Sequence, residues 1–262
     1  MPAGYVHFGV GDKWIEADGK LPDGTPVRFV YGDSAKGDDG KDSVEERGRK
    51  LAEVLSEASR WEAGLFGEYR HKSLTISFLD FEELYHPLVA GWNTIVMNME
   101  FAGKNDEPIP ATQDMLVHEL AHTWLEAIDS KDGDAYVEEA IPTYLQWAWL
   151  EKHSHKDLAA KYRDQIKEIQ TNGWERTGPY GVSGPGLYGL RRLVGDTALE
   201  QTLKDWLPAH AGKPAAWNDF RTTMEKNSGK NLEEFFGAWF PPQSTGRTQP
   251  SDKILWPGWS RN

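Results

Sequence analysis

The sequence of 262 residues contains no cysteine. This absence excludes disulfide bonds and thiolate metal ligands, so any metal ion in this protein needs histidine or carboxylate ligands. Because a protein without cysteine suits both reducing and oxidising compartments, the absence does not decide where the protein works.

Hydrophobic segments long enough to cross a membrane are also missing, since no run of about eighteen apolar residues occurs. Residues 1–5 lack the basic region and apolar core of a signal peptide. We therefore expect a soluble protein, and both a mature secreted chain and a cytoplasmic chain stay open. Basic residues are scarce too, with 29 Lys and Arg against 41 Asp and Glu and a net charge of −12. This balance predicts that neither nucleic acid nor a membrane is a partner.

What is present is typical of a globular chain. Hydrophobic residues make up 39% of the sequence and charged residues 27%. The length allows one large domain or two lobes with a full-sized core. Twelve tryptophans are many. We expect most of them in the core and some along a groove for a peptide or another extended polymer.

The most informative stretch is the pentapeptide HELAH from His118 to His122, inside an apolar run at 115–125. Histidines four residues apart lie on one face of a helix, so both rings can bind one ion. The helical period turns Glu119 about 100° away from His118, to the side where a bound water would lie. The pattern predicts one Zn²⁺ per chain, with His118 and His122 as ligands and Glu119 as the general base.

A third ligand is expected because catalytic zinc usually has three protein ligands and one open position. Residues 134–146 are typical of a second helix with acidic residues in its first turn, among them the adjacent Glu138 and Glu139. The chain between His122 and Glu139 is long enough for a helix end, a loop and a helix start. Spacing alone leaves either glutamate open as the third ligand.

The zinc motif and the segment EAIPTY from Glu139 to Tyr144 resemble the gluzincin zinc metallopeptidases, which include thermolysin and the zinc aminopeptidases and share a peptidase MA-like catalytic domain. In that group the third ligand opens a helix within a segment similar to Asn-Glu-Gly/Ala-x-x-x-Tyr. The resemblance therefore implies Glu139 as the metal ligand, with Glu138 as its neighbour.

A further match lies in the segment GPYGVSG at 178–184, which precedes LYGLRRLVG at 187–195. In the aminopeptidases a Pro-Tyr-Glu-Lys-Gly segment precedes a similar helix, and its tyrosine donates a hydrogen bond to the tetrahedral oxyanion. The resemblance implies this catalytic role for Tyr180. Gly181 and Val182 replace the Glu-Lys of the family pattern. The alternative is a loop aromatic that only packs through its ring.

The amine anchor of the aminopeptidases is not found in this sequence. Their Gly-x-Met-Glu-Asn segment precedes the zinc motif, and its glutamate binds the free amine of the substrate. The corresponding region here contains Gly91, Trp92, Asn93 and Thr94, without a glutamate. We expect these four residues to contact substrate. We also expect the strand at 94–101 to form an edge of the cleft that pairs with extended peptides, free amine or not.

Periodicity and turn signals predict strands and helices along the chain. Strands are expected at 5–10, 27–31, 74–79 and 94–101, and helices at 43–65, 115–125, 137–152, 155–171, 185–194, 196–206, 214–227 and 231–239. Capping boxes are expected at Ser43 with Glu46 and at Asn231 with Glu234. The tail from Pro241 is expected to be extended.

Other polar residues favour structural explanations. The acidic segment 32–42 lacks the spacing of an EF-hand, so a solvated loop is favoured over a calcium site. His153 and His155 flank a turn, and no motif surrounds His71. Arg191 and Arg192 are expected to make ion pairs on a helix surface, with a substrate carboxylate as the alternative partner.

The predicted fold is α+β, with the two lobes of a thermolysin-like metallopeptidase. Residues 1–128 are expected to form an N-terminal lobe with a mixed β-sheet, helices and the zinc-binding helix. Residues 129–262 are expected to form a mainly helical lobe with an extended tail. The active-site helix is expected in the cleft between the lobes, which together make one catalytic unit, and we expect a monomer.

These inferences predict a zinc-dependent peptidase that hydrolyses peptide or protein substrates. Glu119 is expected to take a proton from the metal-activated water, and Tyr180 to share the oxyanion with zinc. Three alternatives stay open. They are an aminopeptidase-type exopeptidase, a peptide- or glycan-binding module with weak or no hydrolysis, and a hydrolase of another amide or ester.

Overall fold

The computed structural model describes residues 14–32, 44–79, 88–89, 93–98, 110–125, 129–130, 135–153, 155, 178–211 and 213–240. The chain separates into two compact units, Met1–Glu126 and Ala127–Asn262. Each unit is described by itself. The predicted lobe boundary at 128 and 129, and the union of both lobes in one catalytic unit, stay predictions.

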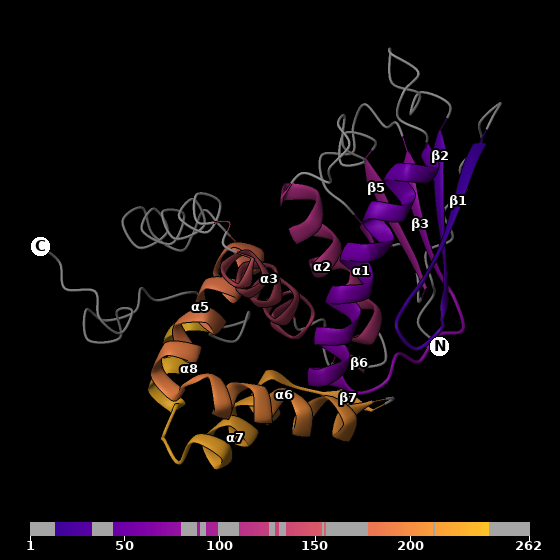
Figure 1. Ribbon diagram of the computed structural model, residues 1–262. Coiled ribbons are helices and arrows are strands. Elements are labelled where there is room, and N and C mark those ends of the chain that lie inside the picture. Colours follow the sequence, from indigo (N-terminus) through magenta and orange to yellow (C-terminus); the bar gives the residue numbers. More distant parts are fainter. Residues whose placement is uncertain are drawn as a thin grey trace, which may run out of the picture. The chain divides into compact units, whose positions relative to one another are not determined.

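Unit 1 contains a mixed five-stranded sheet with the strand order β1-β2-β3-β5-β4 (Figure 1). The pairs β2–β3 and β3–β5 are parallel, and β1–β2 and β4–β5 are antiparallel. The strands are β1 Trp14–Lys20, β2 Pro26–Gly32, β3 Leu74–Leu79, β4 Leu88–Val89 and β5 Thr94–Asn98. The predicted strands at 27–31 and 74–79 are confirmed, and the one predicted at 94–101 is confirmed over 94–98. The prediction missed β1 and β4, while residues 5–10 lie outside the described part of the chain.

The alternation of side chains in β2 and β3 explains why these strands lie at the centre of the sheet. Val27, Phe29 and Tyr31 are buried on β2, and Leu74, Ile76 and Phe78 are buried on β3. Successive strand residues point to opposite faces, so each set shares one face. The rings of Tyr31 and Phe78, which are register partners, stack with centroids 4.9 Å apart.

Two helices complete the described part of unit 1, α1 Val44–Phe66 and α2 Pro110–Leu125. They confirm the helices predicted at 43–65 and 115–125. Helix α1 lies against the sheet (Figure 1). A methyl group at Gly19 would come within 2.7 Å of the Ala52 side chain, so β1 approaches α1 too closely for any larger residue. The C-terminal ends of α1 and α2 lie side by side, because Phe66 and Trp124 contact each other.

Unit 2 is mainly helical, and its core is aromatic. The helices are α3 Ala135–Lys152, α5 Gly178–Val194, α6 Asp196–His210, α7 Trp217–Ser228 and α8 Glu233–Trp239, and the strands β6 Asp129–Ser130 and β7 Pro214–Ala215 form a short parallel pair. Trp217 stacks on Phe220 at 4.5 Å, and Phe220 meets Trp206 edge-on at 5.3 Å. The described tryptophans of this unit are core residues, as predicted.

Several local predictions for unit 2 can be compared with the structure. The helices predicted at 137–152, 196–206, 214–227 and 231–239 correspond to α3, α6, α7 and α8. The capping box at Asn231 and Glu234 was wrong, because Leu232 is the N-cap residue of α8 and has no side-chain cap. Asn231 Oδ1 instead accepts a hydrogen bond from the Glu233 backbone N–H at 3.0 Å. The predicted helix at 155–171, the tail and the Ser43 capping box lie outside the described residues.

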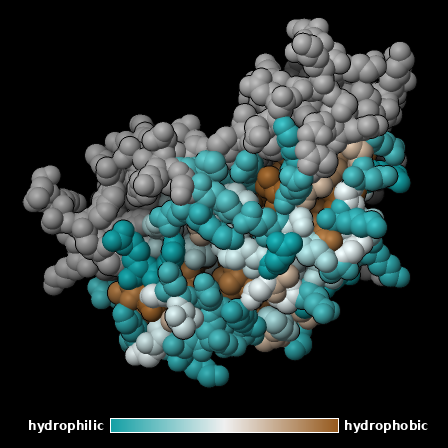
Figure 2. All heavy atoms as spheres, viewed as in Figure 1, coloured by the Kyte–Doolittle hydropathy of each residue, from teal (hydrophilic) through white to brown (hydrophobic). Residues whose placement is uncertain are grey.

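The surface in view is mostly hydrophilic. In Figure 2 the described hydrophobic residues appear as small separate areas among teal ones. Within the described ranges, no helix has both the length and the hydropathy that crossing a membrane requires.

A buried acid stands out on the core face of α1. Glu62 is 0% exposed, and within the described ranges neither of its carboxyl oxygens has a hydrogen-bond partner. Burial raises the pKa of Glu62 well above its ordinary value of 4.5, because the interior disfavours the charged form. The folded protein therefore keeps this carboxyl protonated at pH values where the unfolded chain releases the proton.

We expect this acid to lower the free energy of unfolding as the pH rises. Below pH 4.5 both states hold the proton, so the cost is smallest there; it grows until the pH passes the pKa of the folded state. Glu62→Gln should therefore gain stability over the parent, and the gain should be larger at pH 8 than at pH 4. Urea unfolding in a metal chelator measures the difference. Glu53→Gln, on the exposed side of α1, is the control. A gain at Glu62 that stays constant between the two pH values would contradict the prediction.

Candidate metal centre

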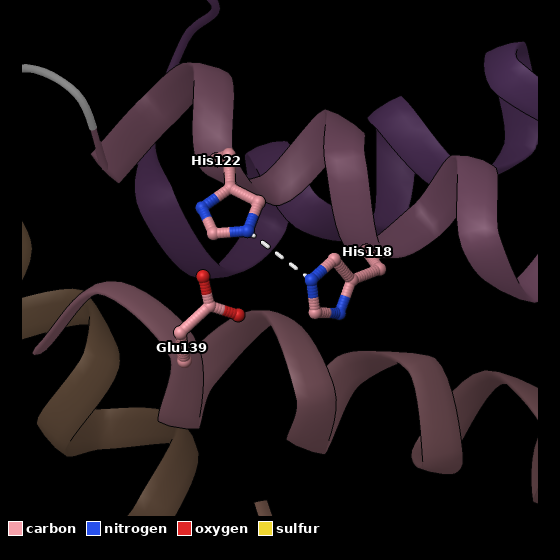
Figure 3. Close-up of side chains that lie close together, drawn as sticks. All are labelled: His118, His122 and Glu139. Carbon is pink, nitrogen blue, oxygen red and sulfur yellow. Dashed lines mark hydrogen bonds between the residues drawn. The ribbon is translucent and has the colours of Figure 1, made fainter. Parts of the chain in front are cut away.

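The two histidines of the motif lie on one face of α2. Their rings are 4.9 Å apart between centroids and inclined by 69°, and the two Nε2 atoms are 3.1 Å apart. One of these nitrogens donates a hydrogen bond to the other when a proton lies between them (Figure 3). Without that proton, both nitrogens can direct a lone pair at one cation, so the two rings converge as the spacing in the sequence predicts.

Glu139, in the second turn of α3, joins the two histidines. Its carboxylate points toward the imidazoles of His118 and His122 (Figure 3). Each of the three side chains offers one ligand atom, and these atoms all lie within 4.8 Å of one another. Of the neighbouring Glu138 only the backbone is described, so the choice between the two glutamates rests on this grouping of Glu139.

The separations suit a tetrahedral metal ion. Zinc–ligand bonds of about 2.0–2.1 Å at tetrahedral angles place two ligand atoms about 3.3 Å apart. The 3.1 Å between the histidine nitrogens is close to that value. Two neutral imidazoles and a carboxylate form the mixed nitrogen and oxygen set that catalytic zinc sites use. The residues present therefore fit a zinc ion.

Glu119 lies on the same helix between the two ligands in sequence. Its side chain is only 4% exposed, and its neighbours Leu120 and Ala121 are fully buried. The apolar run around the motif is thus a buried helix, as the sequence predicts. Taking a carboxylate out of water is costly unless it interacts strongly with its surroundings, so an acid here needs a reason beyond packing.

Helix α3 is fixed within unit 2 by a close, parallel contact with α5. A methyl group at Gly184 would come within 2.1 Å of the Thr143 side chain, so only glycine allows this approach. One turn further on, the rings of Trp147 and Tyr188 lie 5.7 Å apart. In both pairs the α5 residue is numbered 41 higher than its α3 neighbour. These two contacts show that α5 runs parallel to α3 over residues 184–188 and 143–147.

The segment at 178–184 was wrongly predicted to be a loop before the helix, because α5 already begins at Gly178. Its glycines and prolines argue for a loop on propensity alone. Pro179 is acceptable in a first helical turn, and Gly184 allows the contact with α3, so packing overrides the weak propensity. Tyr180 thus lies in the first turn of α5, and only its backbone is described.

The far ends of α3 and α5 are joined by an ion-pair network. Tyr188 donates a hydrogen bond to Glu151, and Arg191 donates to Glu151 at 2.9 Å and also to Asp196. The bond from Arg191 lowers the pKa of Asp196, and the bond to Asp196 is the main cause that raises the pKa of Arg191. Arg191 therefore makes the predicted helix-surface ion pair.

The predicted substrate segment is only partly described, since Gly91 and Trp92 lie outside the described residues. Asn93 donates a side-chain hydrogen bond to Ser73 at 3.1 Å, and its carbonyl accepts one from the Thr75 backbone N–H at 2.8 Å. Thr94 begins β5 as the register partner of Thr75. Both described residues thus attach β5 to the start of β3.

The prediction that this strand is a free edge was wrong. Strand β5 lies between β3 and β4, and Ile95 and Val96 pair with Val89 and Leu88. The edge strands of the described sheet are β1 and β4. Of these, β4 lies beside α2, the helix that carries the histidines. The order of strands depends on contacts distant in sequence, and a two-residue strand leaves no pattern to detect.

The fold is similar to that of solved M1 zinc metallopeptidases and of an aminopeptidase A, so the metallopeptidase fold implied by the sequence motifs is confirmed. An M1 zinc metallopeptidase from Deinococcus radiodurans matches with a TM-score of 0.63 and 20% identity, over 87% of this chain and 51% of that one. A mutant of that peptidase bound to a Tyr-Ser-Ala substrate matches with a TM-score of 0.66 and 20% identity, over 91% and 52%.

Aminopeptidase A of Legionella pneumophila in complex with aspartic acid matches with a TM-score of 0.66 and 18% identity, over 87% of this chain and 28% of that one. The chain thus spans about half the length of the Deinococcus structures and less of the Legionella one. No family model and no curated protein matches the sequence.

We expect about one zinc ion per chain after dialysis against metal-free buffer and titration with zinc, measured by elemental analysis. Glu139→Ala should lose most of the affinity, because two ligands cannot hold a catalytic zinc ion tightly. Glu138→Ala is the matched control and should bind zinc like the parent. The opposite result for the two glutamates would reverse their roles. A folded parent that takes up no zinc would refute the site.

Proposed function

We propose that this chain is a zinc-dependent peptidase that hydrolyses peptide bonds with a glutamate as general base. The observation that carries the proposal is the grouping of His118, His122 and Glu139 in a chain with the M1 zinc metallopeptidase fold. A zinc ion held by these residues would acidify a water molecule and polarise the substrate carbonyl.

Glu119 supplies the proton transfers in this proposal. It adjoins His118 in sequence, and the helical period turns it to the side of the histidine pair. Its burial, with 4% of the residue exposed, keeps competing water away from the carboxylate. The carboxylate accepts a proton from the attacking water and then passes it to the leaving amine.

Tyr180 is proposed to donate a hydrogen bond to the developing oxyanion. The support is the register of α3 and α5, which, if continued by one turn toward the start of α5, pairs position 180 with position 139. That register is set by the contacts of Gly184 with Thr143 and of Tyr188 with Trp147. Oxyanion stabilisation requires a donor that is held in place before the reaction, and a position on a helix packed against α3 suits that requirement.

The substrate is proposed to lie along β4 in place of β5. This strand is an edge of the sheet and lies beside α2. An extended peptide can add to such an edge through main-chain hydrogen bonds, which bind many sequences alike. Gly91 and Trp92 follow β4 in the chain after Ala90 and are proposed to contact the side chains of the substrate.

An aminopeptidase is the second candidate function. A solved structure with this fold is named aminopeptidase A, and that likeness favours removal of single residues from a free N-terminus. The segment from Gly91 to Thr94 contains no carboxylate to bind a free amine, which argues for a peptidase that accepts blocked substrates. A binding module without hydrolysis would use the same edge strand but leave Glu119 without a role.

We expect Glu119→Gln to reduce hydrolysis by on the order of a hundredfold or more, the usual scale for a lost general base, and to retain zinc and the fold. Peptide cleavage is followed by mass spectrometry, and zinc content is measured on the same samples. Glu138→Gln is the control for a neighbouring charge. Equal rates for Glu119→Gln and the parent would remove the general-base role.

The same assay separates the two candidate functions when it uses a free-amine peptide and its N-acetylated twin. Cleavage of both peptides supports the peptidase proposed above. Cleavage of the free-amine peptide alone, one residue at a time, favours the aminopeptidase. A parent that binds zinc and both peptides but cleaves neither is a binding module.

We expect Tyr180→Phe to lower kcat by about tenfold or more and to change KM little, because the lost hydrogen bond matters mainly in the transition state. Steady-state kinetics on one peptide measures both constants. Tyr188→Phe is the control, since it removes a hydroxyl from the same helix that bonds to Glu151. An unchanged kcat for Tyr180→Phe would leave this residue only a packing role.

A further inference from the structure

The last turn of α2 is held by a segment that no motif identifies. Helix α2 ends at Leu125, three residues after His122, and the last carbonyls of a helix have no partner within it. The carbonyl of Thr123 lies 3.1 Å from Nε2 of His71. A carbonyl can only accept a hydrogen bond, so Nε2 of His71 carries the proton and donates.

A second hydrogen bond joins the same two segments in the opposite direction. Nε1 of Trp124 donates to the carbonyl of Gly67 at 3.2 Å. Gly67 ends α1 with a positive φ of 89°, and its own N–H bonds to the Ala63 carbonyl at 2.9 Å. The segment after α1 therefore offers α2 both a donor, the imidazole of His71, and an acceptor, the carbonyl of Gly67. These two groups bond to the neighbouring residues Thr123 and Trp124.

Aromatic contacts complete this attachment, which we call the clasp (residues 66–71 with Thr123 and Trp124). The ring of Tyr69 meets Trp124 edge-on at 4.8 Å and meets His71 edge-on at 5.3 Å. Phe66 contacts Trp124 at 5.9 Å. Both Tyr69 and Trp124 are buried, so the clasp belongs to the core of unit 1. The imidazole of His71 thus has a fixed orientation.

The position of the clasp matters because Thr123 follows His122 directly. A backbone shift in this turn would move the imidazole of His122, and a misplacement of about 1 Å is enough to impair a catalytic site. Residues that orient metal ligands from outside commonly change metal affinity about 10–100-fold when they are replaced. The bond from His71 reaches the carbonyl of Thr123, the residue that follows that candidate ligand.

We propose that His71 is a positioning residue for the candidate metal centre. Its hydrogen bond to the Thr123 carbonyl holds the last turn of α2, and thereby holds His122 in the position that binds metal. The proposal rests on the proposed function to the extent that His122 is a zinc ligand.

The test compares His71→Phe and His71→Gln with the parent. Phenylalanine keeps a ring for the contact with Tyr69 but has no donor, whereas glutamine keeps an N–H donor. His210→Ala is the matched control, because Nδ1 of His210 lies 2.8 Å from the Trp206 carbonyl, near the end of α6, a helix without candidate ligands. Zinc affinity is measured by competition with a chelator, and geometry by the absorption spectrum of the cobalt-substituted protein. Both readouts are independent of peptide cleavage.

We expect His71→Phe to weaken zinc affinity about tenfold and to change the cobalt spectrum. His71→Gln should recover most of the affinity, and His210→Ala should bind zinc like the parent even if its thermal stability falls. A folded His71→Phe variant with the affinity and spectrum of the parent would overturn the proposal, and the proposed function would stand. If His71→Phe does not fold, His71→Leu, which also lacks a donor, is measured in its place, with the same expected result and the same contradicting result. A parent that binds no zinc overturns both.

Discussion

A catalytic metal ion with three protein ligands allows little variation in the distances between the three ligand atoms. The two helices that carry the candidate ligands, α2 and α3, must satisfy this constraint. Two ligands four residues apart meet it locally, because one helical turn sets the rings of His118 and His122 at the right spacing. The third ligand cannot be placed by local geometry. Glu139, the candidate third ligand, comes from α3, and the place of α3 within its unit depends on the close approach of α5 that Gly184 allows at Thr143.

Local patterns were therefore the part of this protein that the sequence could predict. The helical spacing of the histidines identifies a metal site, and alternation in β3 or an amphipathic run in α1 identifies an element, because each pattern lies within a few residues. The start of α5 could not be predicted in the same way. Its glycines and prolines favour a loop, and only the neighbouring helix makes them compatible with a helical turn. The register of α5 against α3 at Gly184 and Thr143 likewise exists only once both helices are packed.

The order of the strands is a second feature of the fold that local sequence patterns could not predict. Strand β5 was correctly recognised, yet its place in the sheet was not, because pairing with β4 removes the edge that a substrate would use. Strand β4 has two residues in its ladder, too few for any periodicity to appear. Strand β1 carries Glu16, Asp18 and Lys20 on an edge, and such charges hide a strand from hydrophobic patterns while protecting the edge from pairing with other chains.

Sequence patterns also miss polar residues of unit 1 that belong to no motif, such as His71 and Glu62. An isolated histidine such as His71, or an acid such as Glu62 on the core face of a helix, belongs to no motif, because its partners come from distant segments. The two residues differ in whether the folded protein gives them a hydrogen-bond partner within the described ranges. His71 is half-buried and donates to a helix carbonyl that would otherwise lack a partner, so its partial burial costs little. Glu62 has no hydrogen-bond partner within the described ranges and stays protonated, so it lowers stability wherever the unfolded chain would ionise. The helix that carries the two candidate histidine ligands thus lies in a unit that combines the clasp at the end of α2 with a destabilising acid in the core. Both features are consistent with a structure in which the position of α2 takes priority over maximal stability.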